Sequence, residues 1–410
     1  MQNNPESSIH YHYPLSPELQ FLLACCQAQP DLAEIALQMR NEELGIRNRK
    51  KMISLASRHG ILPLVYKTLR NLSQTNNTLT IHSHSLIAEL KARYQSIAQR
   101  NMLMSAELIR IMKLLKENNI EALAFKGPAL SQMAYGDITL RQYSDLDILV
   151  EEADACEAGR LMGENGHTPV LPLSILSNKT CLHTAKDFSL ISKGGVHTEL
   201  HWRLFEKKYN ISLLSCAVEQ KCQSVTINGQ PVKTLQNELL LVYLCLHGAK
   251  HAFERIEWIC DIDRLIRTSE VDWDTAISLA EQSHSKRSFY LGLSLAHTLL
   301  HTPVPETLIP SIEDETIQTL HTLTLSQMMN KKMGRSDLEK NRETFAFQSK
   351  LFDTKLDMLR FRFSTFFKIS TTDCQTFILP EPLKFFYIIL RPLRLAGSYM
   401  RRWVEGKRSA

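Results

Sequence analysis

The chain is 410 residues long, 44% of its residues are apolar, and 48 basic against 43 acidic residues give it a net charge of +5. This length exceeds what one hydrophobic core usually fills, so we expect two or three structural units in an ordinary globular protein. The charge excess is too small to require a nucleic-acid partner, and it suits a phosphate-bearing small molecule equally well.

The cysteines and the distribution of apolar residues favour a soluble protein of the cytoplasm. Nine cysteines are scattered through the chain without a C-x-x-C pair. They fit neither a zinc module nor a disulfide framework, which indicates a reducing compartment. The polar N-terminus lacks the layout of a signal peptide, and nowhere does an apolar run approach the roughly 20 residues that would cross a bilayer.

Residues 1–115 are predicted to form an N-terminal helical region. Apolar residues recur at helical spacing in residues 17–26, 30–39, 59–71 and 87–117. The pair Asn118-Asn119 is a plausible stop for the last of these helices. The region contains no recognisable chemistry and is interpreted as a packing unit for the core that follows.

The pattern changes in residues 116–235, which we expect to form an α/β core. A short apolar strand at 123–125 leads to a Lys126-Gly127-Pro128 corner, a short helix to residue 135 and a polar loop through Arg141. A second strand follows, with Asp145 and Asp147 separated by one residue. Because side chains alternate along a strand, both carboxylates emerge from the same face.

Two interpretations of this acidic pair stay open. Adjacent anions on a rigid strand repel each other, so such a pair usually holds a cation, and Mg²⁺ is the first hypothesis. Alternatively, Asp145 and Asp147 are only the polar half of an amphipathic strand, since short motifs match often by chance. The corner and helix just upstream favour the metal site.

A third acid lies further along the core. After a helix at 151–166 and a weakly patterned loop at 169–185, the runs DFSLIS and VHTELHW flank Lys193-Gly194-Gly195, which is typical of a hairpin turn. Glu199 shares one face of the second run with His197 and His201. If this strand lies beside the one with the acidic pair, three carboxylates converge, as metal-assisted phosphoryl transfer requires. The alternative is an edge strand with a polar outer face.

The motifs KGPAL, RQYSDLDILV and VHTELHW, in this order, resemble the nucleotidyltransferase superfamily of DNA polymerase β and kanamycin nucleotidyltransferase, and most closely a poorly characterised bacterial branch of it. The resemblance covers residues 123–202. It implies an α+β fold, in which a small mixed sheet is embedded in helical flanking regions. It also implies transfer of an NMP from an NTP, with ATP first among the candidates, to a hydroxyl of a small molecule, sugar or peptide.

By the same resemblance, Asp145, Asp147 and Glu199 are the catalytic residues and hold Mg²⁺, as two ions. Most members of the superfamily carry a Gly-Ser pair where this chain has Lys126-Gly127, and Glu199 replaces the commoner aspartate. Gly127 still permits close backbone approach, and the amides that open the following helix still favour an anion. The altered corner motivates the alternative of a catalytically silent nucleotide-binding or scaffolding protein that keeps the fold.

Further nucleotide-binding candidates flank this core. Arg141 precedes Asp145 by four residues and reaches phosphate oxygens or stays in solvent, while Ser144 caps the strand or contacts phosphate. In the predicted helical domain at 236–330, His247, Lys250 and His251 share one helix face toward the nucleotide cleft, or satisfy buried polar neighbours such as Asp261. The histidine spacing also permits zinc, but the glutamate of H-E-x-x-H is missing.

Residues 331–410 are predicted to form a basic and aromatic helical tail after a flexible connection at 330–340. An apolar run at 385–390 precedes Arg391, Arg394, Arg401 and Arg402. Three interpretations stay open: a terminal helix docked on the core, a contact with a membrane surface, and a groove for nucleic acid such as tRNA. We favour the docked helix, because Pro392 is expected to break any long amphipathic surface.

Overall fold

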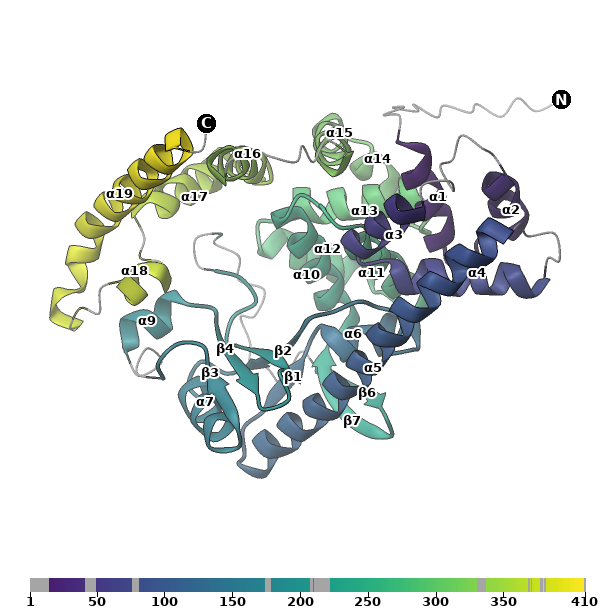
Figure 1. Ribbon diagram of the computed structural model, residues 1–410. Coiled ribbons are helices and arrows are strands. Elements are labelled where there is room, and N and C mark those ends of the chain that lie inside the picture. The colour runs from purple at the N-terminus through teal and green to yellow at the C-terminus, as the bar shows by residue number, and fades with distance from the viewer. Residues whose placement is uncertain are drawn as a thin grey trace.

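The structure is a computed structural model that describes residues 15–40, 49–75, 81–173, 178–206, 209, 222–329, 337–367, 369, 371–376, 379 and 381–408. It has an α+β fold, as predicted: a small mixed sheet of five strands lies among many helices (Figure 1). The polar N-terminal residues 1–14 lie outside the described residues.

The N-terminal region is helical, as expected. Its helices are α1 (Pro17–Cys26), α2 (Leu32–Arg40), α3 (Arg49–Arg58), α4 (Leu62–Thr75) and α5 (Ile81–Glu117). The helix predicted at 59–71 begins later, because Gly60 adopts a φ of +71° in the turn between α3 and α4. The predicted stop after α5 is confirmed, with Asn119 at a φ of 58°.

The central sheet has the strand order β1-β2-β5-β4-β3. Its strands are β1 (Ala122–Ala124), β2 (Asp145–Val150), β3 (His167–Pro169), β4 (Asp187–Ser192) and β5 (His197–His201). β2 and β5 are parallel neighbours whose register places Asp147 opposite Glu199. The expectation that the two acidic strands lie side by side is therefore confirmed.

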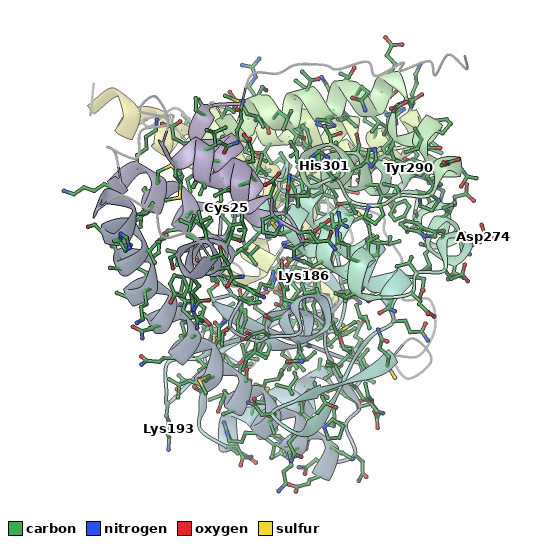
Figure 2. All side chains as sticks on the ribbon, turned by 90° about the vertical axis from the view of Figure 1, so that its right-hand side faces the viewer. Cys25, Lys186, Lys193, Asp274, Tyr290 and His301 are labelled. Atoms are coloured by element: carbon green, nitrogen blue, oxygen red, sulfur yellow. The ribbon has the colours of Figure 1, made fainter. Side chains whose placement is uncertain are left out.

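The predicted hairpin joins β4 to β5. The Val196 carbonyl accepts a bond of 2.9 Å from the Ser192 amide, and Gly195 takes the positive φ of 76° that the turn requires. Figure 2 shows Lys193 of this turn at the periphery and Lys186, just before β4, in the middle of the molecule. The two strands are antiparallel, so β4 runs toward this turn and β5 runs away from it.

Three parts of the core differ from the prediction. The segment 169–185 was expected to be a loop, but it contains α9 (Lys179–Thr184), which Asn178 caps by accepting a 3.1 Å bond from the Cys181 amide. The helix expected at 151–166 is α7 (Ala155–Glu164), which begins later and ends earlier than predicted; the two residues after it lead into β3. A second small sheet, β6 (Cys222–Ile227) with β7 (Gln230–Leu235), was not predicted.

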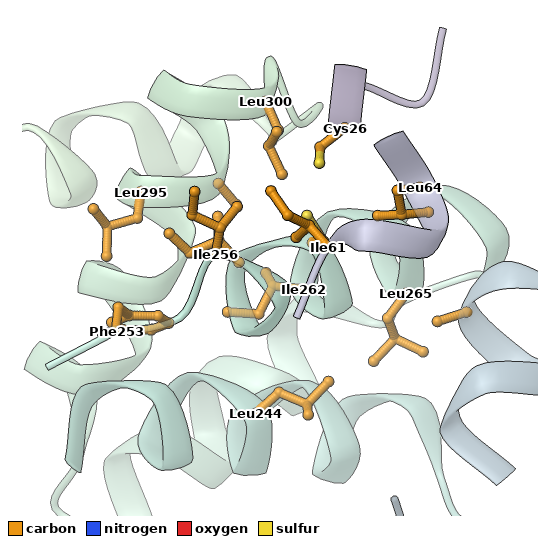
Figure 3. Close-up of a cluster of buried hydrophobic side chains, with 14 of the residues drawn as sticks. Cys26, Ile61, Leu64, Leu244, Phe253, Ile256, Ile262, Leu265, Leu295 and Leu300 are labelled. Atoms are coloured by element: carbon orange, nitrogen blue, oxygen red, sulfur yellow. The ribbon is translucent and has the colours of Figure 1, made fainter. Parts of the chain in front are cut away.

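A helical body follows the sheets. It comprises α10 (Asn237–Lys250), α11 (Ile256–Thr268), α12 (Trp273–Gln282), α13 (Lys286–Leu300), the 3₁₀ turn η5 (Glu306–Leu308), α14 (Ile309–Ile312) and α15 (Glu315–Met329). Its core also receives side chains from the N-terminal helices. Figure 3 shows Cys26, Ile61 and Leu64 among residues of α10, α11 and α13. The N-terminal helices and the helical body thus share one core.

The sheet lies between two hydrophobic cores, and the alternation of side chains along β2 determines which core each side chain enters. Leu146, Ile148 and Val150 pack into the core formed with α5 and α7. Leu149 points the other way, into the helical core. Because Asp145 and Asp147 share the face of Leu149, both carboxylates are directed toward the helical body.

The C-terminal elements are α16 (Asp337–Lys350), α17 (Lys355–Phe367), α18 (Thr371–Thr376), the 3₁₀ segment η6 (Glu381–Phe386) and α19 (Tyr387–Arg408). The expectation that Pro392 breaks the last helix is wrong, because α19 continues through it. The bond that Pro392 cannot donate would go to the carbonyl of Ile388, which belongs to an exposed residue. Residues 330–336 of the predicted flexible connection lie outside the described residues.

None of the described helices combines the length and the apolar content that a membrane crossing requires.

Candidate active site

The corner between β1 and α6 (Gly127–Tyr135) brings a lysine over the middle of β2. Gly127 has a φ of +52°, and a Cβ at this position would lie 3.3 Å from the carbonyl oxygen of Asp145. Only glycine adopts this conformation without strain, and its small size lets α6 start directly beside β2. Pro128 then opens the helix, where a missing N–H costs nothing. The side chain of Lys126 is left largely buried, with Nζ 2.9 Å from Oδ1 of Asp147.

Three potential metal ligands meet on the same face of β2 and β5. Ligand atoms of Asp147, Glu199 and His201 all lie within 4.8 Å of one another. Nε2 of His201 is 3.4 Å from Oδ1 of Asp147 and 3.2 Å from Oε2 of Glu199. The parallel register creates this cluster, because it sets Asp147 beside Glu199, and His201 follows two residues later on the same face.

The donor atoms of this cluster have the character expected of a metal site. Both ring nitrogens of His201 are buried, and within the described part of the chain neither makes a hydrogen bond of normal geometry, whereas Oδ1 of Asp147 is paired with Lys126. Buried polar atoms usually have partners, and exceptions indicate a missing ion or water. Two carboxylates and an imidazole are suitable ligands for a divalent cation. The residues present therefore fit a metal ion.

Charge around Asp147 is balanced within the protein. Burial alone would raise the pKa of Asp147, but Lys126 and His201 outweigh it and hold this pKa well below its usual range. Burial opposes the charge of Lys126 as well, yet Asp147 raises the pKa of its ammonium. The His201 contact lowers the pKa of Glu199. Asp147 and Glu199 are therefore both anionic, and Lys126 is the cation beside them.

Asp145 has a different environment from Asp147. It is only half-buried and lines the open cleft above the strand, and its carboxylate does not belong to the three-residue cluster. Burial and the neighbouring Asp147 raise its pKa. The two aspartates that the sequence analysis treated alike thus differ in position: one lies inside the cluster, and the other lies at its mouth.

A cleft of about 380 Å³ opens above these carboxylates. It is lined by the middle of α5, the Lys126 corner, the loop before β2, β2 itself, the end of α10, the start of α11 and the loop between these two helices. Its polar and charged walls are formed by Arg100, Asn101, Lys126, Arg141, Gln142, Tyr143, Ser144, Asp145, Asp147, His247, His251, Glu254, Arg255 and Glu257. The cleft thus combines cationic side chains with the acidic pair.

One wall of the cleft is aromatic. The ring centroids of His247 and Trp258 are 5.3 Å apart, and those of His251 and Trp258 are 5.5 Å apart. Burial, followed by the charge of Lys126, holds the pKa of His247 well below its usual value. His247 is therefore a neutral ring at physiological pH, and the pair His247–His251 faces the cleft, as one of the open interpretations expected.

Arg141 has a role that neither sequence interpretation foresaw. It is buried, and its Nε donates to both carboxylate oxygens of Asp261 at 2.9 and 3.0 Å. Tyr135 donates to the same carboxylate at 2.8 Å. The interpretation of Arg141 as a solvated loop residue is wrong, because Asp261 draws it into the interior. Asp261 is thus the partner of Arg141 and Tyr135, whereas His247 packs against Trp258.

The remaining predicted residues divide between the cleft and its surroundings. Ser144 is exposed and lines the cleft, and its carbonyl accepts a 3.1 Å bond from Arg100. Lys250 points away from the cleft: its Nζ is 3.3 Å from Glu206 and lies over the ring of Tyr209. The expected contact of Lys250 with the nucleotide therefore stays a prediction, since Lys250 is not among the residues that line this cleft.

Several cleft residues were not proposed from the sequence. His201 carried the clearest signal, since it shares the strand face of Glu199. Arg100, Arg255 and Trp258 carried none, because only the packing of α5, α10 and α11 against the sheet brings them together. Glu257 is buried, and burial raises its pKa to about 7 even though Arg141 and Arg255 oppose the shift.

Residues 47–301 match the sequence profile of a family described as uncharacterised nucleotidyltransferase. The chain belongs to this family. The matched range includes every residue that lines the cleft, from Ile97 to Trp258. Membership supports nucleotidyl transfer as the general reaction.

A solved structure, an antigenic nucleotidyltransferase-like protein from Paracoccidioides brasiliensis, is similar to this chain. The two share 16% sequence identity, the similarity covers 51% of this chain and 95% of that chain, and the TM-score is 0.30. No curated protein matches the sequence.

Proposed function

We propose that this protein transfers an NMP from an NTP to a hydroxyl group, with a divalent ion held by Asp147, Glu199 and His201. The hydroxyl oxygen forms a bond to the α-phosphorus, the bond from that phosphorus to the bridging oxygen breaks, and pyrophosphate leaves. The hydroxyl proton is released to solvent. When bound, the ion neutralises phosphate charge and lowers the pKa of the attacking hydroxyl. Mg²⁺ and Mn²⁺ both accept the carboxylate oxygens of Asp147 and Glu199.

The observation that carries the proposal is the register of β2 and β5. It sets Asp147, which lines the cleft, directly beside Glu199, with His201 within 3.4 Å of both. An acidic pair on an isolated strand has no such convergence. Asp145, at the mouth of the cluster, is placed to bind a second ion together with Asp147, as the resemblance to the DNA polymerase β superfamily implies.

Cations around the cleft suit the triphosphate. Arg100, Arg255 and Lys126 line its walls, and Arg141 also lines the cleft while its Nε donates to Asp261. Arginine recognises phosphate oxygens through paired N–H donors. We therefore assign the triphosphate to this side of the cleft, above Asp145.

The aromatic wall suits the nucleobase. Trp258 presents its indole beside His247 and His251, and neutral rings of this kind stack on bases of any sequence. The base is thus held mainly by stacking in this proposal. ATP is the first nucleotide to test, and the acceptor is a small molecule, a sugar or a peptide.

A second candidate is a catalytically silent nucleotide-binding protein. The observation that favours it is Lys126, whose ammonium lies 2.9 Å from the Asp147 oxygen that faces the cluster. A fixed ammonium at this place can neutralise the carboxylate in place of an ion. The two candidates differ in whether any product forms.

The test is an assay of the full chain with each labelled NTP, Mg²⁺ or Mn²⁺ and a panel of hydroxyl acceptors. We expect pyrophosphate release together with a product heavier than the acceptor by one NMP. Asp147→Asn and Glu199→Gln should each lower the rate at least about 100-fold, because each removes a charged ligand from the site.

Glu164→Gln is the matched control, because it makes the same carboxyl-to-amide change on the exposed face of α7. Its rate should equal that of the unchanged protein. Saturable NTP binding without any pyrophosphate release would favour the silent candidate. Equal rates for Asp147→Asn and Glu164→Gln would eliminate the proposed metal site.

A further inference from the structure

The helix α17 is amphipathic, but its apolar side faces outward and polar side chains lie on its buried side. Its apolar side chains Leu356, Leu359, Phe363, Phe366 and Phe367 follow the spacing of one helix stripe, and 39–61% of each is exposed. The opposite side, which packs inward, carries Asp357, Phe361 and Ser364. A helix of a globular protein normally turns its apolar stripe toward the core. Apart from the contact of Phe366 with the ring of Phe345, no element in the described part of the chain covers this stripe.

The neighbouring segment repeats the arrangement. In η6 and α19, Leu383, Phe385, Phe386, Ile388, Ile389, Leu393 and Met400 are 41–69% exposed. Arg391 points the other way: it is buried and donates from its Nε to the carbonyl of Thr365 on α17 at 3.2 Å. The two helices thus pack side by side at one corner of the molecule, away from β2 and α6 (Figure 1).

Buried ion pairs join α18 to α19 at this corner. Asp373 is buried, and its two oxygens accept bonds of 2.5 Å from Arg391 and Arg394. These two arginines are therefore not available to an external anion. The outward surface is defined here as the apolar face, comprising the exposed side chains of α17, η6 and α19 named above.

The charge of the chain is concentrated in the same segment. Residues 354–410 contain eleven Lys and Arg against four Asp and Glu, a net charge of +7, whereas the whole chain has +5. Residues 1–353 are accordingly net negative. Among the basic side chains, Lys355, Arg360 and Arg362 are exposed on α17 beside the apolar face.

We propose that the apolar face docks on the surface of an anionic lipid bilayer. Its phenylalanine, leucine and isoleucine side chains would enter the boundary between headgroups and acyl chains, while the flanking basic residues meet lipid phosphates. Exposed Phe and Leu on one side of a basic amphipathic helix are typical of segments that lie in this boundary. Basic residues near an anionic surface add electrostatic attraction to this burial.

Other partners fit this face less well. Nucleic acid would require outward cations in place of outward apolar groups, and Arg391 and Arg394 are bound to Asp373. A second copy of this chain would bring one segment of net charge +7 against another, which repel each other. An anionic bilayer satisfies both the apolar side chains and the charge.

The experiment is co-sedimentation of the full chain with phosphatidylcholine vesicles and with vesicles that also contain phosphatidylglycerol. We expect binding to the anionic vesicles, weaker binding to the neutral ones, and release as salt is added. The triple variant Phe363→Ser, Ile389→Ser, Leu393→Ser should bind at least about tenfold more weakly, since three apolar side chains no longer enter the lipid.

The matched control is Met102→Ser with Leu103→Ser on α5, where the side chains are 59% and 69% exposed. It should bind vesicles as the unchanged chain does. All variants are compared by thermal melting and by sedimentation velocity. Failure to bind anionic vesicles would overturn the proposal, as would equal binding by the triple variant. A dimer abolished by the triple substitution would assign the face to a second copy, and RNA binding without vesicle binding would assign the segment to nucleic acid.

Discussion

At the scale of single residues, the site depends on the pair Lys126 and Asp147. The Asp147 side chain is buried, the Lys126 side chain is 15% exposed, and Lys126 brings the formal positive charge nearest to Asp147. Removing one partner of a buried ion pair leaves the other charge uncompensated, which typically costs about 3–5 kcal/mol. Lys126→Met should therefore lower the stability of the metal-free protein by about 3 kcal/mol, measured by urea unfolding with a chelator present. Added Mn²⁺ should restore much of this loss.

Lys250→Met is the control for this prediction. Its side chain is 17% exposed against 15% for Lys126, and it also pairs with a carboxylate, that of Glu206. Because Glu206 is 33% exposed and lies outside the cluster, the loss should be smaller, and Mn²⁺ should not reverse it. An equal effect of Mn²⁺ on both variants would show that Lys126 does not stand in for an ion.

Glu257 gives the fold a predictable pH dependence. Burial raises its pKa to about 7 from an ordinary value near 4.5, so the folded state binds a proton that the unfolded state has lost. The stability that this proton contributes is fully present below pH 4.5 and is lost as the pH rises through 7. Glu257→Gln should therefore gain stability relative to the unchanged protein between pH 5 and pH 8, by about 3 kcal/mol at most. Urea unfolding at both pH values measures this, and a constant difference would contradict it.

Residue patterns predicted part of this chemistry. Alternation along two strands was enough to place Asp147 and Glu199 on matching faces, and the same rule placed His201 there. Arg141 could not be interpreted from its neighbours, because its partner Asp261 lies 120 residues away. Which loop residues become buried is decided by packing between distant elements, and a single sequence does not encode that locally.

At the scale of elements, the corner before α6 determines how closely a helix approaches β2. Gly127→Ala should cost about 1–2 kcal/mol, because alanine is strained at a φ of +52°. Its Cβ would also press on the carbonyl of Asp145, so metal affinity should fall. Gly136→Ala is the matched control: its φ is +66°, but no atom lies within 4 Å of the added Cβ. It should lose similar stability, measured by urea unfolding, and keep its metal affinity, measured by calorimetry.

Elements with strong periodicity or turn chemistry were predictable, and weak ones were not. The hairpin with Lys193-Gly194-Gly195 and the helices of the N-terminal region followed from local signals. The short helix α9 and the strands β6 and β7 lack alternation clear enough to recognise, and tertiary contacts stabilise them instead. The prediction at Pro392 was wrong because α19 is exposed there, so water can bond the carbonyl that loses its backbone partner.

At the scale of the whole molecule, the cleft exists because the helical body covers one face of the sheet. β2 sends Asp145, Asp147 and Leu149 toward that body and the alternate residues toward α5 and α7. The sequence predicted the two faces, but not which helices would cover them. The division of the chain into regions 1–115, 116–235, 236–330 and 331–410 stays a prediction, and the shared core of the first and third argues for treating them as one folding unit.

The central claim is that β2 and β5 together hold one divalent ion. The most direct measurement is a titration with Mn²⁺, in which electron paramagnetic resonance counts the free ion for the unchanged protein, Glu199→Gln, His201→Asn and the control Glu164→Gln. We predict saturable binding to the unchanged protein and the control, and affinity at least about tenfold weaker for each of the other two variants. Equal affinity in all four proteins would contradict the account.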